Sequence, residues 1–571
     1  MNDRSISLIV PVYNVEPQWL EAAIESVRRQ TYPHWQLCIV DDGSSHRETL
    51  DYLRYLHDER IQILFLSANH GIAAASNAAL SLAKGEFVGF LDHDDELAPE
   101  ALQQVVRVIT ESEPDLIYSD EEYIKPNGNC YSAHCKPDYS PDLLLSINYI
   151  CHFAVYRRSL LQQIGGLREG YDGAQDHDLL LRFLERTDKV FHIPRVLYRW
   201  RRIPGSTADR FAHKHYAWEA GRKAVAEALY RRGIAGKVAL GRHPGVYRVR
   251  REIRNNPKVS IIIPFRDFPI VLERCLDSIL NRTTYSHFEI IGVSNQSQEP
   301  ATLAMMAAYQ QQDTRIRFLH YDQLFNFSAI NNFAAKQAKG EHLLLLNNDT
   351  EVINSDWLQA LLEHSQRPEV GAVGAKLYYP NNTIQHAGII IGLGGSAGHS
   401  HKCFDRNDPG YFNRLEAIQN ISAVTGACLM VKKTVYNALG GLDEINLPIA
   451  FNDVDFCLRL REQGYLNVFT PYCELYHHES RSRGLETTPS RKKKFRQERA
   501  YLRQRHIAIF TKGDPYYNPN LTLNRETFGL RLRQLRPMGF ALRDEWQAHH
   551  SLIGVLAGFS RELLRLLCVR N

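Results

Sequence analysis

Residues 6–13 read Ile-Ser-Leu-Ile-Val-Pro-Val-Tyr, and residues 259–266 repeat the pattern as Val-Ser-Ile-Ile-Ile-Pro-Phe-Arg. Each copy leads to a second apolar run that ends in a polar turn, Phe-Val-Gly-Phe-Leu-Asp-His-Asp-Asp at 87–95 and Leu-Leu-Leu-Leu-Asn-Asn-Asp at 343–349. Solenoid repeats recur about every 20–50 residues, which is much shorter than the distance between these two copies, so the self-similarity indicates a duplicated domain. We therefore expect the same chemistry twice.

Length and composition describe an ordinary globular protein. For 571 residues, a prior of about 150 residues per domain and the duplication favour two large domains with smaller additions. The chain is 44% hydrophobic and 23% charged, and its net charge of +4 is too small to indicate a nucleic-acid partner. Composition alone gives no function, and we expect no nucleic acid as a partner.

The N-terminus and the cysteines predict a cytoplasmic protein. The first predicted strand starts within about five residues, which leaves no room for a signal peptide. The ten cysteines are scattered without a CxxC pair, so we expect them to be reduced. Cys130 and Cys135 flank His134, and we interpret them as structural thiols rather than a metal site.

No apolar run reaches the roughly 20 residues that a membrane-spanning helix needs, and the best candidate, residues 552–559, is too short. Two segments are nevertheless basic. Residues 481–505 hold ten Lys and Arg residues, and residues 561–570 mix leucines with arginines. They predict either peripheral contact with the anionic inner face of the cell membrane or a solvated helix face, and the sequence leaves both open.

Apolar β-branched runs alternate with helical patterns in the first copy, which predicts an α/β fold built from β-α-β units. The predicted strands are 5–12, 36–40, 61–66 and 86–91, and the predicted helices are 17–30, 47–57 and 71–83. Such a series builds a mostly parallel sheet with helices on both faces. Ligands bind beyond the carboxyl ends of its strands, so the acidic segments 41–44 and 92–94 are expected to face one crevice.

The chain divides into four predicted segments. They are an N-terminal domain at 1–210, a helical linker at 211–256, a second domain at 257–520 and a basic, partly amphipathic extension at 521–571. The spacing from Asp176 to Asp453 exceeds that from Asp92 to Asn347, so the second copy carries an insertion, which we place within 388–420. Its glycines and the histidines 386, 399 and 401 predict a lid on the acceptor side, with a zinc site as the alternative.

The acid pair at the end of the second apolar run suits a metal. Asp92 and Asp94 lie two residues apart, so an extended backbone points both carboxylates to one side. Paired hard oxygens with open positions suit Mg²⁺ or Mn²⁺ held jointly with phosphates. Acid pairs are also common in turns; the buried strand before this pair and the second acidic strand end at Asp41 and Asp42 favour a functional site.

Four ordered motifs in each copy resemble those of glycosyltransferase family 2. The likeness implies two tandem GT-A (nucleotide-diphospho-sugar transferase) domains and is closest to the two-domain enzymes of bacterial O-antigen and capsule synthesis. In the first copy the motifs are Val10-Pro11-Val12-Tyr13-Asn14, Val40-Asp41-Asp42-Gly43-Ser44, Leu91-Asp92-His93-Asp94-Asp95 and Gln175-Asp176-His177-Asp178. In the second they are Phe325-Asn326-Phe327-Ser328, Leu346-Asn347-Asn348-Asp349, Phe451-Asn452-Asp453-Val454-Asp455 and Tyr476-His477-His478-Glu479-Ser480.

This resemblance implies roles for the acidic residues. Asp41 or Asp42 accepts a hydrogen bond from the donor's base, and Asp92 and Asp94 bind the nucleotide and the divalent metal on its diphosphate. The residues predicted to bind the donor are Pro11, Tyr13, Asp41, Asp42, Asn69, Asn77, Asp92 and Asp94 in the first copy, and Pro264, Ser294, Asn332, Asn347 and Asp349 in the second. The predicted metal ligands are Asp94, Asp349, His477 and His478.

Family members are typically inverting, so the resemblance also implies a general base that takes the proton of the acceptor hydroxyl while the metal stabilises the departing diphosphate. The family's Glu-Asp motif maps onto Gln175-Asp176 and Asn452-Asp453. We assign the base to Asp176 and Asp453. A capping aspartate at a helix N-terminus is the alternative, and the two roles are compatible.

The two copies depart from the family pattern differently. In the second, Ser294-Asn295 replaces the acidic pair, and Asn347-Asn348-Asp349 keeps one carboxylate. His477 or His478 restores a ligand, since the family often places a metal-binding histidine there. The first copy has Arg199 at that place, which can pair with a diphosphate but cannot bind a metal.

Together these inferences predict a bifunctional, inverting, metal-dependent hexosyltransferase in the cytoplasm. It moves sugars from nucleotide-diphosphate donors to a growing lipid-linked oligosaccharide of a surface polysaccharide, O-antigen or capsule, at the inner face of the membrane and beside partner glycosyltransferases. Asn-Asn-Asp motifs occur in relatives of the rhamnosyltransferase type, so we expect the second copy to use a different donor. Two alternatives stay open: a second copy that only binds acceptor, and a nucleotide-binding scaffold without transfer activity.

Overall fold

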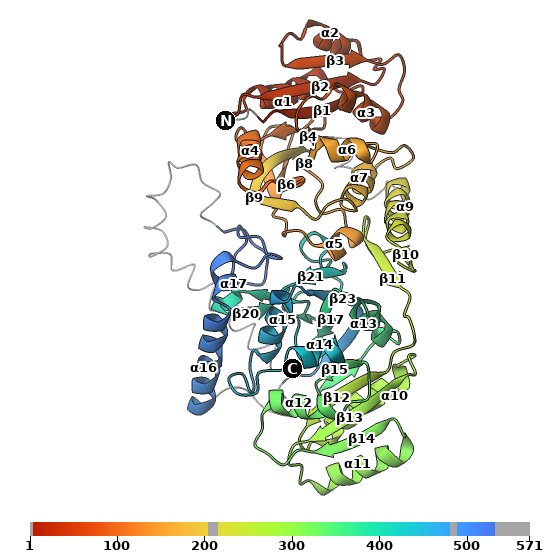
Figure 1. The fold of residues 1–571 in the computed structure, drawn as a ribbon, viewed down its shortest axis with the longest axis vertical. Helices are drawn as coiled ribbons and strands as arrows, with labels where there is room; N and C mark the ends of the chain where they lie inside the picture. Colours follow the sequence, from red (N-terminus) through yellow and green to blue (C-terminus); the bar gives the residue numbers. More distant parts are fainter. Residues whose placement is uncertain (1–3, 204–214, 480–487, 532–571) are drawn as a thin grey trace. The chain divides into compact units, whose positions relative to one another are not determined.

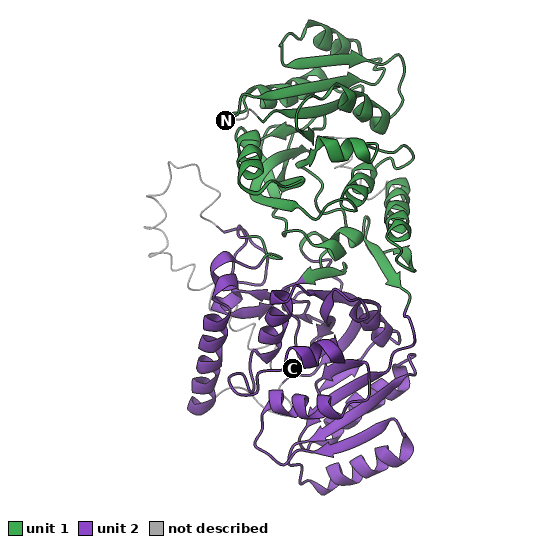
Figure 2. Ribbon diagram, in the orientation of Figure 1, with its two compact units in different colours: residues 1–252, 411–420, 515–518 green, residues 253–410, 421–514, 519–571 purple. Residues whose placement is uncertain are grey.

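The computed structural model describes residues 4–203, 215–479 and 488–531 (Figure 1). The chain divides into two compact units (Figure 2). Unit 1 comprises Met1–Glu252 with two later segments, Tyr411–Asn420 and Pro515–Asn518. Unit 2 comprises Ile253–Gly410, Ile421–Asp514 and the chain from Pro519 onward.

The elements of unit 1 follow the predicted alternation, and the predicted strands and helices are confirmed with ends that differ by no more than two residues. The first half holds β1 (Ile6–Val12), α1 (Pro17–Arg28), β2 (Trp35–Asp41), α2 (Arg47–Tyr55), β3 (Ile61–Phe65), α3 (Ile72–Leu82), β4 (Phe87–Phe90) and β5 (Glu96–Leu97). The second half holds α4 (Ala101–Ser112), β6 (Leu116–Ile124), β7 (Cys130–His134), α5 (Pro141–Ser146), β8 (Ala154–Arg157), α6 (Arg158–Gln163), α7 (Gln175–Phe183) and β9 (Val190–Arg201).

Alternation along β1 divides the core of unit 1 into two layers. All seven residues of β1 are buried. Ile6, Leu8 and Val10 belong to one apolar cluster, and Ile9 belongs to another, because successive side chains of a strand point to opposite faces. Helices cover both faces, which is why the central strands read as continuous apolar runs.

The sheet of unit 1 has the strand order β3-β2-β1-β4-β8-β6-β9-β5, with β7 beside β6. Its half from β3 to β4 is parallel, and β8 enters antiparallel to β4. The carboxyl ends of β1, β2 and β4 therefore share one edge, where the acidic motifs follow the strands.

Unit 2 repeats this order as β14-β13-β12-β15-β22-β17-β23-β16, with β18 beside β17, so the predicted duplication is confirmed. Its strands are β12 (Val259–Phe265), β13 (Phe288–Ser294), β14 (Ile316–His320), β15 (His342–Leu346), β16 (Thr350–Val352), β17 (Val370–Tyr378), β18 (Ile384–His386), β19 (Ile389–Ile391), β20 (Ala397–His399), β22 (Cys428–Lys432) and β23 (Leu466–His477). Its helices are α10 (Pro269–Arg282), α11 (Pro300–Gln312), α12 (Phe327–Gln337), α13 (Trp357–Ser365), α14 (Lys433–Ala438), α15 (Asn452–Glu462), α16 (Pro489–Arg505) and α17 (Ile507–Lys512).

The segment predicted as a helical linker is only partly helical. Helix α9 (His215–Arg231) is followed by an antiparallel hairpin, β10 (Gly236–Leu240) and β11 (Tyr247–Arg251), and both belong to unit 1. Val238 and Leu240 pack against the same apolar cluster as α9, so the hairpin and the helix share one core. The sequence pattern of each element by itself does not predict this shared core. The domain limits at 210, 257 and 520 stay a prediction.

Two late segments complete unit 1. The Asn518 side-chain amide donates to both carboxylate oxygens of Asp120 at 3.0 and 2.9 Å and to the Lys136 carbonyl at 2.8 Å. The Asn420 amide donates to Asp142 at 2.7 Å. These buried side chains tie residues from the last third of the chain to the β6–α5 region, a connection that sequence spacing does not predict.

Candidate active sites

The acidic turn of unit 1 follows β4 and is anchored to β9. The Asp92 N–H donates to the Tyr198 hydroxyl at 3.3 Å, and that hydroxyl donates to Oδ2 of Asp95 at 2.5 Å. The other oxygen of Asp95 accepts from the Arg201 N–H at 2.7 Å. Burial, followed by the charges of Asp94 and Asp92, raises the pKa of the Asp95 carboxyl well above its ordinary value. The turn therefore gathers carboxylates that repel one another, the electrostatic setting of a cation site.

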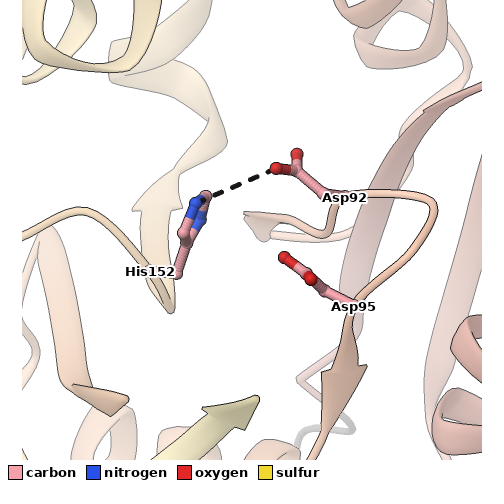
Figure 3. Close-up of side chains that lie close together, drawn as sticks. All are labelled: Asp92, Asp95 and His152. Carbon is pink, nitrogen blue, oxygen red and sulfur yellow. Dashed lines mark ion pairs between the residues drawn. The ribbon is translucent and has the colours of Figure 1, made fainter. Parts of the chain in front are cut away.

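His152 completes a group that the sequence did not suggest. Ligand atoms of Asp92, Asp95 and His152 all lie within 4.8 Å of one another (Figure 3). Nε2 of His152 lies 3.9 Å from Oδ2 of Asp92. Two carboxylates and an imidazole form a mixed oxygen and nitrogen set, which suits Mn²⁺ better than the oxygen-preferring Mg²⁺. Asp94, the predicted metal ligand, lies in the same turn, and burial raises the pKa of its carboxyl.

The strand end before Gly43 distinguishes the two neighbouring aspartates. Oδ2 of Asp41 accepts from the Ser44 N–H at 3.1 Å, whereas Oδ1 is buried without a hydrogen-bond partner among the described residues. Both oxygens of Asp42 accept from the His70 and Gly71 N–H groups, each at 2.8 Å. A buried unsatisfied acceptor costs about 1–3 kcal/mol, so Oδ1 of Asp41 is poised for a ligand donor. This favours Asp41 over Asp42 for the predicted base contact.

Glycine at position 43 lets the neighbouring loop approach this turn. Gly43 has φ +67°, and a Cβ there would lie 2.4 Å from the carbonyl carbon of Ala68. Only glycine tolerates both the left-handed backbone and that approach. Asn69, which follows Ala68, and Tyr13 after β1 are both exposed, so the structure leaves these predicted donor-binding side chains accessible.

Asp176 lies in the first turn of α7, as the predicted base should. Its Oδ2 accepts from the side-chain amide of Asn148 at 2.7 Å. The helix N-cap is Ala174, so Asp176 is not the capping residue, although the helix dipole still stabilises its carboxylate. Burial and the charge of Glu121 are the main causes that raise the pKa of the Cys151 thiol, and Asp176 and Asp92 raise it further. Both carboxylates therefore lie near that one side chain.

Unit 2 contains a pocket of about 900 Å³ at the corresponding strand ends. Five predicted residues line it: Pro264, Asn347, Asp349, Asp453 and His477. The structure thus brings together in one cavity residues as far apart in the chain as Pro264 and His477.

The metal motif of unit 2 pairs its carboxylate with a histidine. Nε2 of His477 lies 3.1 Å from Oδ1 of Asp349 and 3.2 Å from the amide nitrogen of Asn347, and Gln385 holds Nδ1 at 2.8 Å. Burial lowers the pKa of His477, but Asp349 has the larger effect and raises that pKa overall. In the same way, burial alone would raise the pKa of Asp349, but His477 lowers it. Carboxylate, amide and imidazole together fit a divalent cation.

Asp453 sits at the start of α15, in the place of Asp176. Its Oδ2 accepts from the Gly426 N–H and its Oδ1 from the Val454 N–H, both at 2.8 Å. Phe451 holds the N-cap position, so Asp453 is not the N-cap residue, although it accepts from an N–H of the first turn. Burial raises the pKa of the Asp453 carboxyl despite these hydrogen bonds. A raised carboxyl pKa brings a base closer to the pH at which proton transfer is efficient.

Other predicted residues of unit 2 have structural partners. Ser294 ends β13 opposite Phe265, in the place that Asp41 has in unit 1. The Asn295 amide donates to the carbonyls of Tyr321 and Gln323 at 2.9 and 2.8 Å. Nε2 of His478 lies 3.3 Å from Glu351, so of the two candidate histidines it is His477 that lies against Asp349.

Asn77 and Asn332 fasten their helices to following loops. Asn77 donates to the Leu167 carbonyl and accepts from the Leu167 N–H, both at 2.9 Å. Asn332 makes the same pair with Leu442 at 2.9 and 3.0 Å. Pro11, buried in β1, similarly supports the site through its carbonyl, which accepts from the His93 ring at 3.0 Å. Donor contacts from these residues stay a prediction.

The predicted insertion holds the β19–β20 hairpin, and Ile389, Ala397 and His399 line the pocket. Nδ1 of His386 lies 2.7 Å from Nδ1 of His399. Burial lowers the pKa of His399 to about 4, so this pair is neutral near pH 7. His401 instead pairs with the Ser400 hydroxyl at 2.6 Å.

Two contributions to the sites have no signal in the sequence. Asn148 and His152 lie in the loop between α5 and β8, far along the chain from the acidic motif and without any motif of their own. In unit 2, Arg491 and Lys494 of α16 line the pocket, although the basic run 481–505 was interpreted as a membrane or solvent face. Three-dimensional proximity alone identifies both.

A family model for glycosyl transferase family 2 matches residues 7–165, within unit 1, and residues 260–440, mostly within unit 2, which together make up more than half of the chain. The chain belongs to this family. It is 42% identical over 533 residues to the O-antigen biosynthesis protein RfbC of Myxococcus xanthus, covering 92% of this chain and 41% of RfbC. The chain thus spans less than half of RfbC.

Two further likenesses are shorter. The chain is 35% identical over 163 residues to UDP-Glc:alpha-D-GlcNAc-diphosphoundecaprenol beta-1,3-glucosyltransferase WfgD of Escherichia coli, covering 28% of this chain and 63% of WfgD. The crystal structure of S. aureus TarS 1-349 in complex with UDP-GlcNAc aligns with a TM-score of 0.34 and 21% identity over 39% of this chain and 66% of that chain. The family match and the repeated sheet order identify two tandem GT-A domains.

Within the described residues, no helix combines the length and the apolar character needed to cross a bilayer. The basic C-terminal stretch at 561–570, predicted to contact a membrane, lies outside the described residues.

Proposed function

We propose that both units are active, inverting glycosyltransferases that add two sugars from nucleotide-diphosphate donors to a lipid-linked surface polysaccharide. The observation that carries the proposal is the repeated placement of an aspartate in the first turn of a helix, Asp176 in α7 and Asp453 in α15. A module that only bound nucleotide would have no use for an acceptor-side base in both copies.

The chemistry follows from the residues of each site. Asp176 or Asp453 takes the proton of the acceptor hydroxyl as that oxygen attacks the anomeric carbon and the nucleoside diphosphate departs. Mg²⁺ or Mn²⁺, when bound, neutralises the charge that develops on the diphosphate. Asp41, with its unsatisfied Oδ1, and Ser294 at the same place in unit 2 offer different groups to the donor's base. This difference supports two different donors.

The names of the relatives support the class of acceptor. RfbC is named for O-antigen biosynthesis, and WfgD for transfer from UDP-Glc to a diphosphoundecaprenol-linked sugar. We extend both to this chain as a proposal: a nucleotide sugar as donor, a lipid-linked oligosaccharide as acceptor, a cytoplasmic enzyme at the inner face of the membrane, and partner glycosyltransferases that build the rest of the chain.

The test is release of nucleoside diphosphate from a panel of UDP, dTDP and GDP sugars, with membrane-extract acceptor and Mg²⁺ or Mn²⁺. Wild type is compared with Asp176→Asn and Asp453→Asn. We expect each substitution to silence a different donor. If only one substitution matters, the other unit is a binding domain, and if wild type is inactive with every donor, acceptor and metal, the proposal of transfer is wrong.

A further inference from the structure

Strand pairing shows that the histidine near the acidic turn comes from a different element in each unit. In unit 1, β5 pairs with β9 with Glu96 opposite Arg199; in unit 2, β16 pairs with β23 with Glu351 opposite Tyr476. The next pair in unit 2 is Thr350 with His477. Continuing the unit 1 register by one residue puts Trp200, and not Arg199, at the position of His477.

The converse exchange occurs in the loop before β8, the strand that pairs with β4. In unit 1, β4 pairs with β8 with Phe87 opposite Arg157, and in unit 2, β15 pairs with β22 with His342 opposite Lys432. Five residues before Arg157 is His152, and five residues before Lys432 is Ala427. Unit 1 therefore has His152 and Trp200 where unit 2 has Ala427 and His477.

The ring of His152 is held in place but keeps its nitrogens free. It stacks on Tyr198 with ring centres 4.6 Å apart and planes inclined by 12°, and its edge meets Trp200 at 5.4 Å. Among the described residues, the imidazole of His152 has no hydrogen-bond partner. Nε2 of His152 lies 3.9 Å from Oδ2 of Asp92, which is too far for a hydrogen bond.

A buried lysine fixes the backbone that carries this ring. The Lys136 ammonium donates to the Ile150 carbonyl at 2.6 Å and to the His152 carbonyl, and it pairs with Glu121 at 3.0 Å. Glu121 accepts in turn from the His152 N–H at 3.2 Å. These contacts fix the backbone at His152, and stacking on Tyr198 orients its ring.

The separation of the free atoms suits an ion. Ligands of an octahedral Mg²⁺ at about 2.1 Å lie about 3 Å apart when adjacent and about 4.2 Å apart when opposite. The 3.9 Å between His152 and Asp92 and the 4.8 Å limit for the group with Asp95 fall close to this range (Figure 3). Each oxygen of Asp95 accepts one hydrogen bond already, yet a carboxylate oxygen has a second lone pair for a metal.

We propose that His152 is the metal-binding histidine of unit 1 and does from the loop before β8 what His477 does from the end of β23 in unit 2. The inference rests on the proposed function in one respect, namely that the bound metal is the cation of the nucleotide-sugar donor. Trp200 takes the position that His477 has in unit 2, and its ring meets the edge of the His152 ring.

The test measures Mn²⁺ binding to the full-length protein by the electron paramagnetic resonance signal of free Mn²⁺, without acceptor, alone and with UDP, dTDP or GDP. All variants carry His477→Ala, which removes the imidazole of unit 2. We expect His152→Ala to weaken the remaining Mn²⁺ binding at least about tenfold. The reciprocal exchange, His152→Ala with Trp200→His, should restore it.

A second measurement detects the bond between the His152 nitrogen and Mn²⁺ directly. Pulsed resonance should detect nitrogen coupling to Mn²⁺ in the His477→Ala protein, and His152→Ala should abolish that coupling while the melting temperature stays unchanged. Unaltered Mn²⁺ affinity in the double variant, absence of nitrogen coupling, or absence of unit 1 binding in every nucleotide arm would overturn the inference. Because no sugar transfer is measured, intact His152-dependent binding in an inactive enzyme would refute the proposed function alone.

Discussion

Two aspartates on the same turn of α15 allow a test of the base that carries its own control. Asp453 is the proposed base, and Asp455 lies two residues further along. Asp455 is fully buried against Arg459 and His506, each at 2.8 Å. Asp453→Asn and Asp455→Asn make the same chemical change to the same helix, but the structure predicts opposite consequences for activity and stability.

Loss of a general base typically costs 10²–10⁴ in rate, or about 2.7–5.4 kcal/mol of transition-state stabilisation. We therefore expect Asp453→Asn to lower transfer by unit 2 at least about a hundredfold. The carboxylate accepts from two N–H groups, and an asparagine oxygen satisfies one of them, so the structural loss is one hydrogen bond of about 1 kcal/mol. Transfer by unit 1 should not change.

The pKa shifts give the stability of each variant its sign. Burial raises the pKa of Asp453, so folding favours the neutral form of this carboxyl. The resulting contribution to stability is fully present below the pKa of the unfolded state and is lost as pH rises through the pKa of the folded state. At pH 7 the ionised carboxylate therefore lowers the stability of the fold. Asp455 is the reverse, because His506 and Arg459 outweigh burial and lower its pKa. Its charge stabilises the fold above its unfolded pKa, and this contribution is lost as pH falls through the folded pKa.

Asp455→Asn should therefore cost about 3–5 kcal/mol at pH 7, the loss typical of a broken buried ion pair. Asp453→Asn should change stability by no more than about 1 kcal/mol. Calorimetry at pH 7 and pH 4 measures the stabilities, and nucleoside diphosphate release measures the rates. The reasoning is refuted if Asp453→Asn melts as early as Asp455→Asn, or if it retains transfer within tenfold of wild type.

Three further outcomes are expected. Asp41→Asn should raise the KM for the donor of unit 1 with little change in melting temperature, because the remaining oxygen can accept from the Ser44 N–H and Oδ1 satisfies no protein group; an unchanged KM would reassign base recognition. Lys136→Met should destabilise unit 1 by about 3–5 kcal/mol by leaving the Glu121 carboxylate buried beside His134, measured by thermal unfolding, and a stability equal to wild type would contradict it. Deleting residues 532–571 should release the protein from membranes in flotation assays without changing turnover on a soluble acceptor; unchanged membrane recovery would reject the anchoring prediction.

Strand and helix positions of the first copy were predictable because parallel strands buried on both faces leave long apolar runs in the sequence. The acidic residues at strand ends were predictable for the same reason, since topology fixes where those ends meet. His477 followed from the family motif. His152 did not, because its position depends on the buried Lys136 and Glu121 pair and on the stacking with Tyr198, none of which has a local pattern.

The linker and the late segments show a second limit. The β10–β11 hairpin alternates only weakly, with exposed and half-buried residues along β10, so the helical pattern before it dominated the prediction. Asn420 and Asn518 are single buried amides whose hydrogen bonds to Asp142 and Asp120 span hundreds of positions. Periodicity reports one element at a time and carries no information about such pairings.

The differences between the two sites are larger at the donor's base than at the acceptor. The aspartate in the first helical turn is kept as Asp176 and Asp453, while Asp41 is exchanged for Ser294. A carboxylate accepts only, whereas a hydroxyl both accepts and donates, so the two sites offer different hydrogen-bond patterns to a nucleobase. Divergence at the predicted base contact, with the proposed general base kept in both units, supports the proposal of two enzymes with distinct nucleotide donors acting in succession and weighs against a second copy that survives only as a binding domain.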